Sequence, residues 1–560
     1  MMKYWISFLL TIFFLATGVQ AQKLEEAFDA FQTQWSSGAY SEPEQAQIRQ
    51  TADLMLAQRM AANPDFKKYL KILTILKNDE NGSARFAAWH QVAGSLLLHV
   101  QNRKLKPYRK FIDFSYPFLE RGALRYSNLG TKWLTNARDY KLVFEEELPL
   151  VKYEKLDLIA ERKGDSILIK ATSGVYSPVE EKWRGNGGVV TWERFGLGPE
   201  VYAELGSYEI ETKKGLYDVG EVKMHYPLFF GNRAVKGSFS DKVVSKNNVT
   251  EGSYPRFESA DEILEVENLG KGIQYKGGFR LHGTTVYGFG AAGAKAEIDV
   301  SNNEGELVYQ GKALLFTIKR EERIVGENVA STIYFGQDSI FHPSVNFRFD
   351  IPRRELHLAR GKRGSDRNPF YNSLHKVNID AERLDYFVDK DSIFFDRRSL
   401  GFAKRINPTV FESLKYFEES DYRRLQNIAT TNPIALLKVA FNETGERVIE
   451  ADRVARKLNP NFSVENINSL LYDLVAQGFI NYDAGTGMVE LKDKIFHYAD
   501  ANQKKVDFDV LKITSESKKT NAVFDLKDKS IAINGVSNVE LSHPQRVGFR
   551  PLGVTLRHRQ

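Results

Sequence analysis

The spacing of hydrophobic residues changes several times along the chain, and each change predicts a different kind of structure. Across residues 22–123, apolar positions recur three or four residues apart, as Leu24, Phe28 and Phe31 do, which is the spacing of an amphipathic helix. The segment Ser41-Glu-Pro-Glu44 has the composition of a helix start, because proline and acidic residues favour the first turn. We expect four or five packed helices in this N-terminal domain.

Residues 124–406 show short runs of alternating apolar and polar residues, separated by Gly, Asn and Asp. This alternation predicts strands. No helix-length pattern interrupts it, so a parallel sheet with crossover helices is not expected. The sequence Asp-Ser-Ile recurs before predicted strands, at Gly164–Ile169, Gln337–Phe341 and Lys390–Phe395. This echo favours an elongated body of similar rungs, either a β-solenoid or an open folded sheet, with β-sandwiches as the alternative.

Helical spacing returns in residues 407–493. Three helices and then a hairpin around Asp483-Ala-Gly-Thr-Gly487 are predicted, which is the order of a winged helix; the helices span Pro433–Phe441, Glu450–Leu458 and Val464–Gly478. The β pattern resumes in residues 494–560. The chain therefore predicts an α+β protein with an N-terminal helical domain, an elongated β-rich body and an inserted winged-helix-like module.

The first residues have the features of a signal peptide. Lys3 precedes an apolar run from Tyr4 to Thr17, and Val19-Gln-Ala21 supplies small residues that a signal peptidase recognises. We expect cleavage of residues 1–21 and export to the periplasm or an outer-membrane-associated location. The apolar run is shorter than the about 20 residues of a membrane span, and no later segment reaches that length. No transmembrane span is therefore expected after cleavage.

The composition excludes several kinds of site and anchor. The 560 residues contain no cysteine, which excludes disulfides, thiolate zinc sites and a lipoprotein anchor. Hydrophobic residues at 42% and charged residues at 27% are typical of a folded protein, and the net charge of +6 is small for this length. No motif predicts a cofactor or a metal.

The glycines of Gly288-Phe-Gly-Ala-Ala-Gly293 precede a short strand rather than a helix, so a tight bend or close strand contact is expected.

One segment offers candidate catalytic and glycan-binding residues. Glu181 and Glu193 are candidates for an acid and base pair of the glycosidase type, and Trp183 and Trp192 could stack on sugar rings. Buried aromatic residues flanked by solvated charges explain the same pattern. We therefore do not expect an enzyme, and glycan contact stays an alternative.

A second segment is rich in cations and could contact phosphates or other anions. Its candidate residues are Arg353, Arg354, Arg360, Lys362, Arg363 and Arg367. A solvated loop beside an edge strand would have the same composition.

Nucleic acid is not an expected partner, because the third predicted helix contains Glu465 and Asp473 but no Lys or Arg. The helical module is therefore interpreted as a protein-contact or spacer domain.

Several segments resemble known envelope proteins. Gly174–Pro178, Gly185–Trp192 and Arg363–Tyr371 resemble large exported cell-envelope proteins of Bacteroidota that have no assigned function. This resemblance implies an envelope location and supplies no catalytic residue. Asn521–Val536 is similar to a rung of the lipopolysaccharide-transport folds, whose open sheets hold acyl chains. The strand pattern of Val554–Arg557 runs to the end of the chain, as it would in a fragment.

The sequence favours an exported, non-enzymatic structural or interaction protein whose partners are other envelope proteins. Two alternatives stay open. One is a periplasmic conduit that binds lipid or lipopolysaccharide in an open β groove. The other is a protein that binds or hydrolyses glycans through the region from Trp183 to Trp192.

Overall fold

The computed structural model describes most of the chain. The described residues are 29, 32–33, 40–58, 62–78, 82–99, 105–243, 254–319, 321–362, 364–397, 408–426, 431–506, 508 and 510–542. The predicted signal peptide and the predicted strand Val554–Arg557 lie outside them. The chain forms two compact units: unit 1 comprises Met1–Ala260 and Leu281–Thr284, and unit 2 comprises Asp261–Arg280 and Thr285–Gln560.

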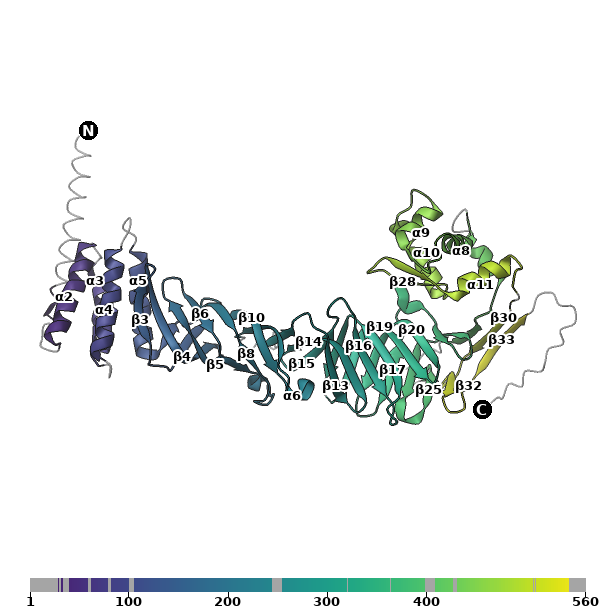
Figure 1. Cartoon of the computed structure of the whole chain (residues 1–560), viewed down its shortest axis with the longest axis horizontal. Helices are drawn as coiled ribbons and strands as arrows, with labels where there is room; N and C mark the ends of the chain where they lie inside the picture. Colours follow the sequence, from purple (N-terminus) through teal and green to yellow (C-terminus); the bar gives the residue numbers. More distant parts are fainter. Residues whose placement is uncertain are drawn as a thin grey trace, which may run out of the picture. The chain divides into compact units, whose positions relative to one another are not determined.

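Four helices lead the described part of unit 1, as the sequence predicts (Figure 1). They are α2 (Glu42–Ala57), α3 (Ala62–Lys77), α4 (Gly82–Leu98) and α5 (Lys106–Arg121). The predicted helix start is confirmed, because the amide of Ser41 donates to Oε2 of Glu44 at 2.7 Å in a capping box. The helices pack through stacked rings, with Trp89 lying 5.5 Å from Tyr69 and 5.7 Å from Phe111 between ring centroids.

Outside the helical module, the rest of the described chain is mostly antiparallel strands. In chain order the elements are β1 (Ala123–Arg125), β2 (Lys132–Thr135), β3 (Lys141–Glu145), β4 (Leu148–Arg162), β5 (Asp165–Ser177), β6 (Lys182–Asn186), β7 (Val189–Thr191), η1 (Glu193–Phe195), β8 (Tyr202–Leu205), β9 (Ser207–Glu211), β10 (Leu216–His225), α6 (Pro227–Phe230), β11 (Val235–Lys242), β12 (Arg256–Ser259), β13 (Leu264–Gly270), β14 (Ile273–His282), β15 (Thr285–Phe289), β16 (Ala296–Ser301), β17 (Leu307–Ala313), β18 (Leu315–Lys319), β19 (Arg323–Phe335), β20 (Asp338–Asp350), β21 (Glu355–Ala359), η3 (Gly364–Arg367), β22 (Phe370–Asn372), β23 (Val377–Asp380), β24 (Arg383–Phe387), η4 (Val388–Lys390), β25 (Ser392–Phe395), β26 (Thr409–Ser413), β30 (Val510–Ser515), β31 (Ala522–Asp525), β32 (Ser530–Ile533) and β33 (Val536–Ser542).

Unit 1 is organised by a long hairpin whose strands change partners midway. The first half of β4 pairs with β3 and its second half with β2, while β5 pairs with β7 near its start and with β6 near its end. The register of β4 against β5 shifts between Tyr153 and Leu158, where the partners change. Because the two halves pair with different strands, the apolar faces meet across an interior. Trp133 of β2 and Tyr217 of β10, which are not paired strands, lie 6.3 Å apart there.

Unit 2 contains a second hairpin of the same kind, formed by β19 and β20. The first half of β19 pairs with β18 and its second half with β17, and β20 pairs first with β22 and then with β21. The register shifts between Gly326 and Ser331. Tyr309 of β17 stacks on Phe347 of β20 at 5.4 Å between the ring centroids, although β19 lies between their strands. These rings fill the interior between the two sets of strands.

The Asp-Ser-Ile echo marks hairpin tips. Asp165 begins β5 after a two-residue turn, and Asp338 begins β20 after another. Lys163 and Gly164 both have positive φ, at 45° and 85°, as a type I′ turn requires. The third copy follows η4 instead of a two-residue turn: Asp391 ends the connection and Ser392 begins β25, which pairs with β24. The repeated sequence therefore marks connections between paired strands and not a fixed sequence period.

The glycines of Gly288–Gly293 serve strand packing, as expected. β15 is followed by a turn and then by β16, with no helix. A Cβ on Gly288 would lie 2.5 Å from the ring of Tyr275, so only glycine admits this ring. A dinucleotide-binding interpretation of the motif fails, because the helix it requires is replaced by a strand.

The helical module, defined as residues 416–502, follows β26 and precedes β30 in unit 2 (Figure 1). Its elements are α7 (Glu419–Gln426), α8 (Pro433–Thr444), β27 (Val448–Glu450), α9 (Ala451–Leu458), α10 (Val464–Ala476), β28 (Ile480–Asp483), β29 (Met488–Leu491) and α11 (Asp493–Asn502). The three predicted helices and the hairpin are present. The sequence patterns did not predict α7, β27 or α11. β26 lies within the predicted module range but pairs with β23 and β30, so it belongs to the β body.

Among the described helices, none combines the length and the apolar character that a membrane crossing requires.

Gly185 tests whether the interior of unit 1 is packed to contact. A Cβ there would lie 2.3 Å from the ring of Tyr208 and 2.5 Å from Nε1 of Trp183. Gly185→Ala should therefore lower the free energy of local opening by about 2 kcal/mol through overpacking. Because the chain lacks cysteine, a single Val151→Cys reporter, at a position with 0% exposure, measures that opening by thiol labelling. Gly220→Ala, which places its methyl in open space, is the matched control, and equal labelling of both variants would contradict the packing.

Candidate functional site

Glu181 lies at the centre of an ion-pair cluster that joins α5 to the strands. Its carboxylate lies 3.2 Å from Nζ of Lys110, 2.5 Å from Nη1 of Arg125 and 2.7 Å from Nζ of Lys213. Burial by itself would raise the pKa of Glu181, but hydrogen bonds from Lys213 and Lys110 outweigh it and lower the pKa. An acid held ionised in this way fits a structural tie better than a proton donor.

Glu193 lies elsewhere and shares no partner with Glu181 among the described residues. It belongs to η1, its side chain is 47% exposed, and it accepts a hydrogen bond from Oγ1 of Thr191 at 2.9 Å. Lys170 Nζ lies 3.6 Å from the same carboxylate. Glu181 and Glu193 therefore have separate sets of partners, which does not fit an acid and base pair that acts on one bond.

The two tryptophans proposed for glycan contact are core residues. Trp183 and Trp192 both have 0% exposure. Trp183 packs 6.2 Å from the ring of Tyr153, and Trp192 meets Phe239 edge-on at 5.7 Å. Neither indole presents a face to solvent on which a sugar ring could stack. The segment therefore fits the alternative interpretation, in which its aromatic residues are buried and the charges beside them are solvated.

Two of the six candidate anion-binding cations are used inside the fold. Arg354 is 5% exposed; its guanidinium donates to Oδ1 of Asp389 at 2.9 Å, to the carbonyl of Ser301 at 2.6 Å and to the carbonyl of Lys271. Arg360 donates to Asp380 and to the carbonyls of three nearby residues, Asp366, Arg367 and Ala381. These contacts fix loops, so neither guanidinium is presented to an external anion.

The other cations of this stretch do not gather in one place. Arg353 lies in the turn between β20 and β21 and is 71% exposed in its side chain. Lys362 and Arg367 are exposed beyond the opposite end of β21, and a strand of five residues separates its ends by about 13 Å. Arg363 lies outside the described residues. The sequence cluster therefore does not become a compact anion site.

The helical module is held on the β body by a buried ion pair. Nζ of Lys494, in α11, lies 2.5 Å from Oε1 of Glu412 in β26, with side chains 6% and 19% exposed. The same Nζ donates to the carbonyl of Gln477 at 2.9 Å. Three rings surround it, at 5.0 Å to the centroid of Phe479, 5.4 Å to Tyr498 and 6.0 Å to Tyr416. Charge, hydrogen bond and cation–π contacts therefore converge on one ammonium.

Further contacts bring the module against the same face. Ser365 of η3 donates its hydroxyl to the carbonyl of Tyr482, and Nε2 of His497 donates to the carbonyl of Lys415 at 2.7 Å. Lys492 Nζ is buried with no hydrogen-bond partner among the described residues. Burial, together with the nearby charge of Lys494, lowers the pKa of Lys492 to about 8.

The burial of inward residues falls at the last strands of unit 2. One row of directly paired residues runs from Ile379 to Phe411, Ile513 and Val539, across β23, β26, β30 and β33. Ile379 is 0% and Phe411 4% exposed, whereas Ile513 and Val539 are half-buried. Within the described residues β33 pairs with β30 alone. Its other edge therefore has backbone groups without a strand partner there.

The opposite set of strands ends in the same way. Its row runs from Tyr386 to Ile393, Phe524 and Ile531, across β24, β25, β31 and β32. The first three are at most 1% exposed, and Ile531 is half-buried. In the described chain β32 pairs with β31 alone. We call the edges of β32 and β33, with these half-buried residues, the open end.

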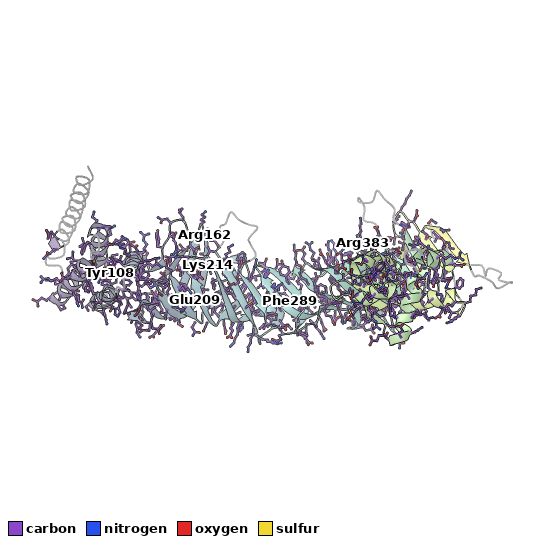
Figure 2. All side chains as sticks on the ribbon, turned by 90° about the horizontal axis from the view of Figure 1, so that it is seen from above. Tyr108, Arg162, Glu209, Lys214, Phe289 and Arg383 are labelled. Carbon is purple, nitrogen blue, oxygen red and sulfur yellow. The ribbon has the colours of Figure 1, made fainter. Side chains whose placement is uncertain are left out.

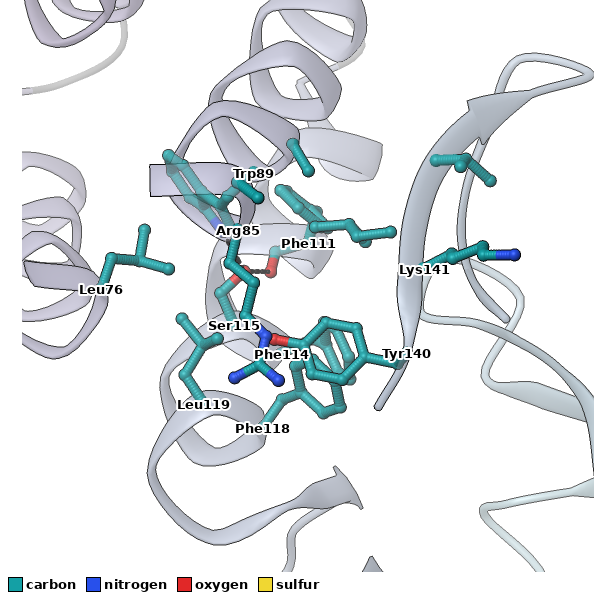
Figure 3. A pocket seen from close by; sticks show the side chains of 14 residues that line it. Leu76, Arg85, Trp89, Phe111, Phe114, Ser115, Phe118, Leu119, Tyr140 and Lys141 are labelled. Carbon is teal, nitrogen blue, oxygen red and sulfur yellow. Dashed lines mark hydrogen bonds between the residues drawn. The ribbon is translucent and has the colours of Figure 1, made fainter. Parts of the chain in front are cut away.

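A pocket of about 300 Å³ lies between α4, α5 and β3 in unit 1 (Figure 3). Its walls are formed mainly by apolar side chains, with Arg85, Tyr140 and Lys141 also among its lining residues. The sequence patterns gave no indication of it, because its lining comes from helices and a strand that are apart in sequence.

Comparison of the chain with family models, with curated proteins and with solved structures found no significant match in any of the three.

Glu181→Gln should weaken the attachment of α5 to the strands. Hydrogen bonds to charged groups contribute about 1.5–3 kcal/mol, so the free energy of local opening should fall by about 2 kcal/mol at pH 7. A single Ala123→Cys reporter, at a position with 0% exposure, reports that opening by thiol labelling. Glu193→Gln should leave it unchanged, because Glu193 is half exposed; an equal effect of both variants would refute the structural tie.

The same variant has a defined pH dependence. The lowered pKa of folded Glu181 stabilises the fold above the unfolded value of about 4.3, and this stabilisation is lost as pH falls through the folded pKa. The difference in unfolding free energy between the parent and Glu181→Gln should therefore shrink below about pH 4. Chemical denaturation followed by far-UV circular dichroism, whose signal does not depend on protonation of a single carboxylate, measures it. A difference that grows on acidification would contradict the assignment.

Lys494→Met should loosen the module. Removing one partner of a buried pair costs roughly 3 kcal/mol, and pairing the change with Glu412→Gln should recover part of that cost in a double-mutant cycle. An Ala440→Cys reporter, at a position 1% exposed, measures opening of the module core by thiol labelling. Lys457→Met removes an ion pair with Glu443 that is 25% and 49% exposed and should cost under about 0.5 kcal/mol. Strict additivity of the Lys494 and Glu412 changes would show that the pair is not coupled.

Proposed function

We propose that the protein is an exported, non-enzymatic interaction scaffold of the cell envelope, and that its open end receives β-strands of another envelope polypeptide. The observation that carries this proposal is the fall in burial at the open end, in both sets of strands. Inward residues go from full burial on β24 and β25 to half-burial at Ile531 on β32, while the strands stay antiparallel.

Within the described residues, the sequences of β32 and β33 have few of the features that usually protect an edge. Edge strands are commonly blunted by lysine, proline or inward charges. β32 has the sequence Ser-Ile-Ala-Ile, without a charge, and β33 carries only Glu540. Unpaired backbone groups of this kind bind an added strand through main-chain hydrogen bonds, and alternate apolar side chains supply specificity. A partner with alternating apolar residues would bury Ile531 and Val539 as the earlier rows are buried.

The interior of the β body supports a scaffold over a lipid conduit. A conduit needs an apolar face that lipid can reach. Inward residues such as Val300, Ile324 and Phe349 have 0% exposure and are covered by protein. The outer faces carry cross-strand ion pairs, for example Lys182 with Glu209 at 2.6 Å between Nζ and Oε1. Glu209 is labelled among the side chains drawn on the ribbon in Figure 2. We therefore interpret each unit of the body as a sheet folded onto itself through hairpins, β4–β5 in unit 1 and β19–β20 in unit 2, in preference to an open groove or separate sandwiches.

The helical module is interpreted as a winged-helix-like contact domain. The order α8, β27, α9, α10, β28, β29, with β29 central in its sheet, is that of a winged helix. Its third helix, α10, contains Glu465 and Asp473 and no cation, and Tyr472 of that helix lies against Gly364 of η3. The helix that would read DNA is thus acidic and docked on the β body, which favours protein contact over nucleic acid.

Photocrosslinking in envelope preparations tests the open end. A photoreactive residue placed at Ser537 of β33 or at Ala532 of β32, both exposed, should crosslink to another envelope polypeptide. The same residue at Lys312, which is exposed on the internal strand β17, should not. Ile531→Lys should abolish the crosslinks by placing a charge in the row that the partner buries. Crosslinking that is equal at all three positions, or unaffected by Ile531→Lys, would refute the proposal.

The envelope location is tested separately by the mature N-terminus. Cleavage after Ala21, as the N-terminal pattern predicts, would give a mature chain that begins at Gln22 and is recovered with the periplasm or the outer membrane. Mass spectrometry of the N-terminal peptide in each cell fraction decides this. An intact Met1 in the cytoplasmic fraction would remove the location from the proposal.

A further inference from the structure

The pocket between α4, α5 and β3 has an apolar body. Its walls include the rings of Trp89, Phe111, Phe114 and Phe118, with Leu142 on the strand side. Trp89 packs against Phe111 and Phe114 against Phe118, so the rings form one continuous wall (Figure 3). A ligand that enters this space would meet carbon on most sides.

The polar side-chain atoms of Trp89 and Ser115, which lie in the wall, are satisfied within the fold. Nε1 of Trp89 donates to Oγ of Ser115 at 2.9 Å, and that hydroxyl donates to the carbonyl of Phe111 at 2.7 Å. Water in the pocket would find few partners, and an apolar cavity of about 150 Å³ stays dry and takes up benzene. The volume here, about 300 Å³, is about twice that. The lining is mostly carbon, so an apolar ligand would gain more contact there than water does.

The rim of the pocket is cationic. The guanidinium of Arg85 lies 4.8 Å from the centroid of the Tyr140 ring and donates to the carbonyl of Arg138. Lys141 also lines the pocket, and its Nζ lies 3.0 Å from Glu154 with both side chains mostly exposed. Arg85 and Lys141 are the two cations among the lining residues, which include no acidic side chain. An apolar body with a cationic rim matches a molecule that has an apolar chain and an anionic head.

We propose that this pocket binds a medium-chain acyl carboxylate, with the chain between α4, α5 and β3 and the carboxylate at the guanidinium of Arg85. The Tyr140 ring and the carbonyl of Arg138 hold the guanidinium of Arg85 at the pocket, and its planar shape suits a carboxylate. This site lies in unit 1, and it depends neither on the open end of unit 2 nor on the location of the protein. Ligand binding at this pocket would therefore be a second property of the protein, separate from the proposed function.

Titration of the mature chain with decanoate, below its micellar concentration, tests the proposal. Saturable binding is expected by calorimetry. Arg85→Gln should weaken decanoate binding about tenfold or more, because a charge-assisted hydrogen bond is lost, and should leave decanol binding within about twofold. Decyltrimethylammonium, with the opposite charge, should bind the parent chain more weakly than decanol. Equal affinity for the three ligands would show that the rim does not recognise the head group and would overturn the proposal.

Filling the pocket separates binding at this site from binding elsewhere. Ala88→Phe and Val143→Phe place a ring in the space from the helix side and from the strand side. Each should abolish decanoate binding while far-UV circular dichroism stays unchanged. Leu98→Ala, at a residue 67% exposed on α4, is the control that should bind like the parent. Unchanged binding by a folded filled variant, or no binding by the parent chain, would refute the site.

Discussion

The fold depends on hairpins whose strands change partners halfway along. β4 and β5 in unit 1, and β19 and β20 in unit 2, each join two sets of strands. A continuous strand that serves two sets must turn its apolar face toward a shared interior, and this interior must then be filled from both sides. Contacts such as Tyr309 on Phe347, at 5.4 Å between ring centroids, meet that requirement.

Two consequences follow for function. The interior of each unit is filled by packed side chains, so the places where the packing stops are the candidates for binding. One such place is the seam between the helices and β3, where helix and sheet surfaces enclose an apolar pocket. Another is the open end, where Ile531 and Val539 lose the cover that the earlier rows have. The ion pair of Lys494 and Glu412 joins the helical module to β26.

The sequence predicts the local elements because their signals are local. Helical spacing locates α8, α9 and α10 to within a few residues, and the turn chemistry at Lys163 and Gly164 explains the Asp-Ser-Ile echo. β27 is three residues long and α11 follows the hairpin directly, so neither offers a long enough period to be recognised. The mid-strand change of partners is also beyond a local pattern, because alternation shows that a face is buried but not which strand covers it.

The candidate site residues were harder to predict for the same reason. Composition alone cannot separate Trp183 in a core from a tryptophan in a binding cleft, since both are flanked by charges. Arg354 and Arg360 look available for anions in the sequence, yet their partners are carbonyls and carboxylates from distant loops, such as Lys271 and Asp380. The pocket beside Arg85 arises only when α4, α5 and β3 come together. Long-range pairing decides each of these cases.

Hydrogen exchange of the isolated chain tests the central claim most directly. If packing ends at the open end, amides of β24 and β25 should be protected strongly, and those of β32 and β33 should exchange much faster, because one edge is unpaired and the row is only half covered. Protection of β32 and β33 equal to that of β24 and β25, in a chain shown to be monomeric, would mean that the end is closed and would contradict the account.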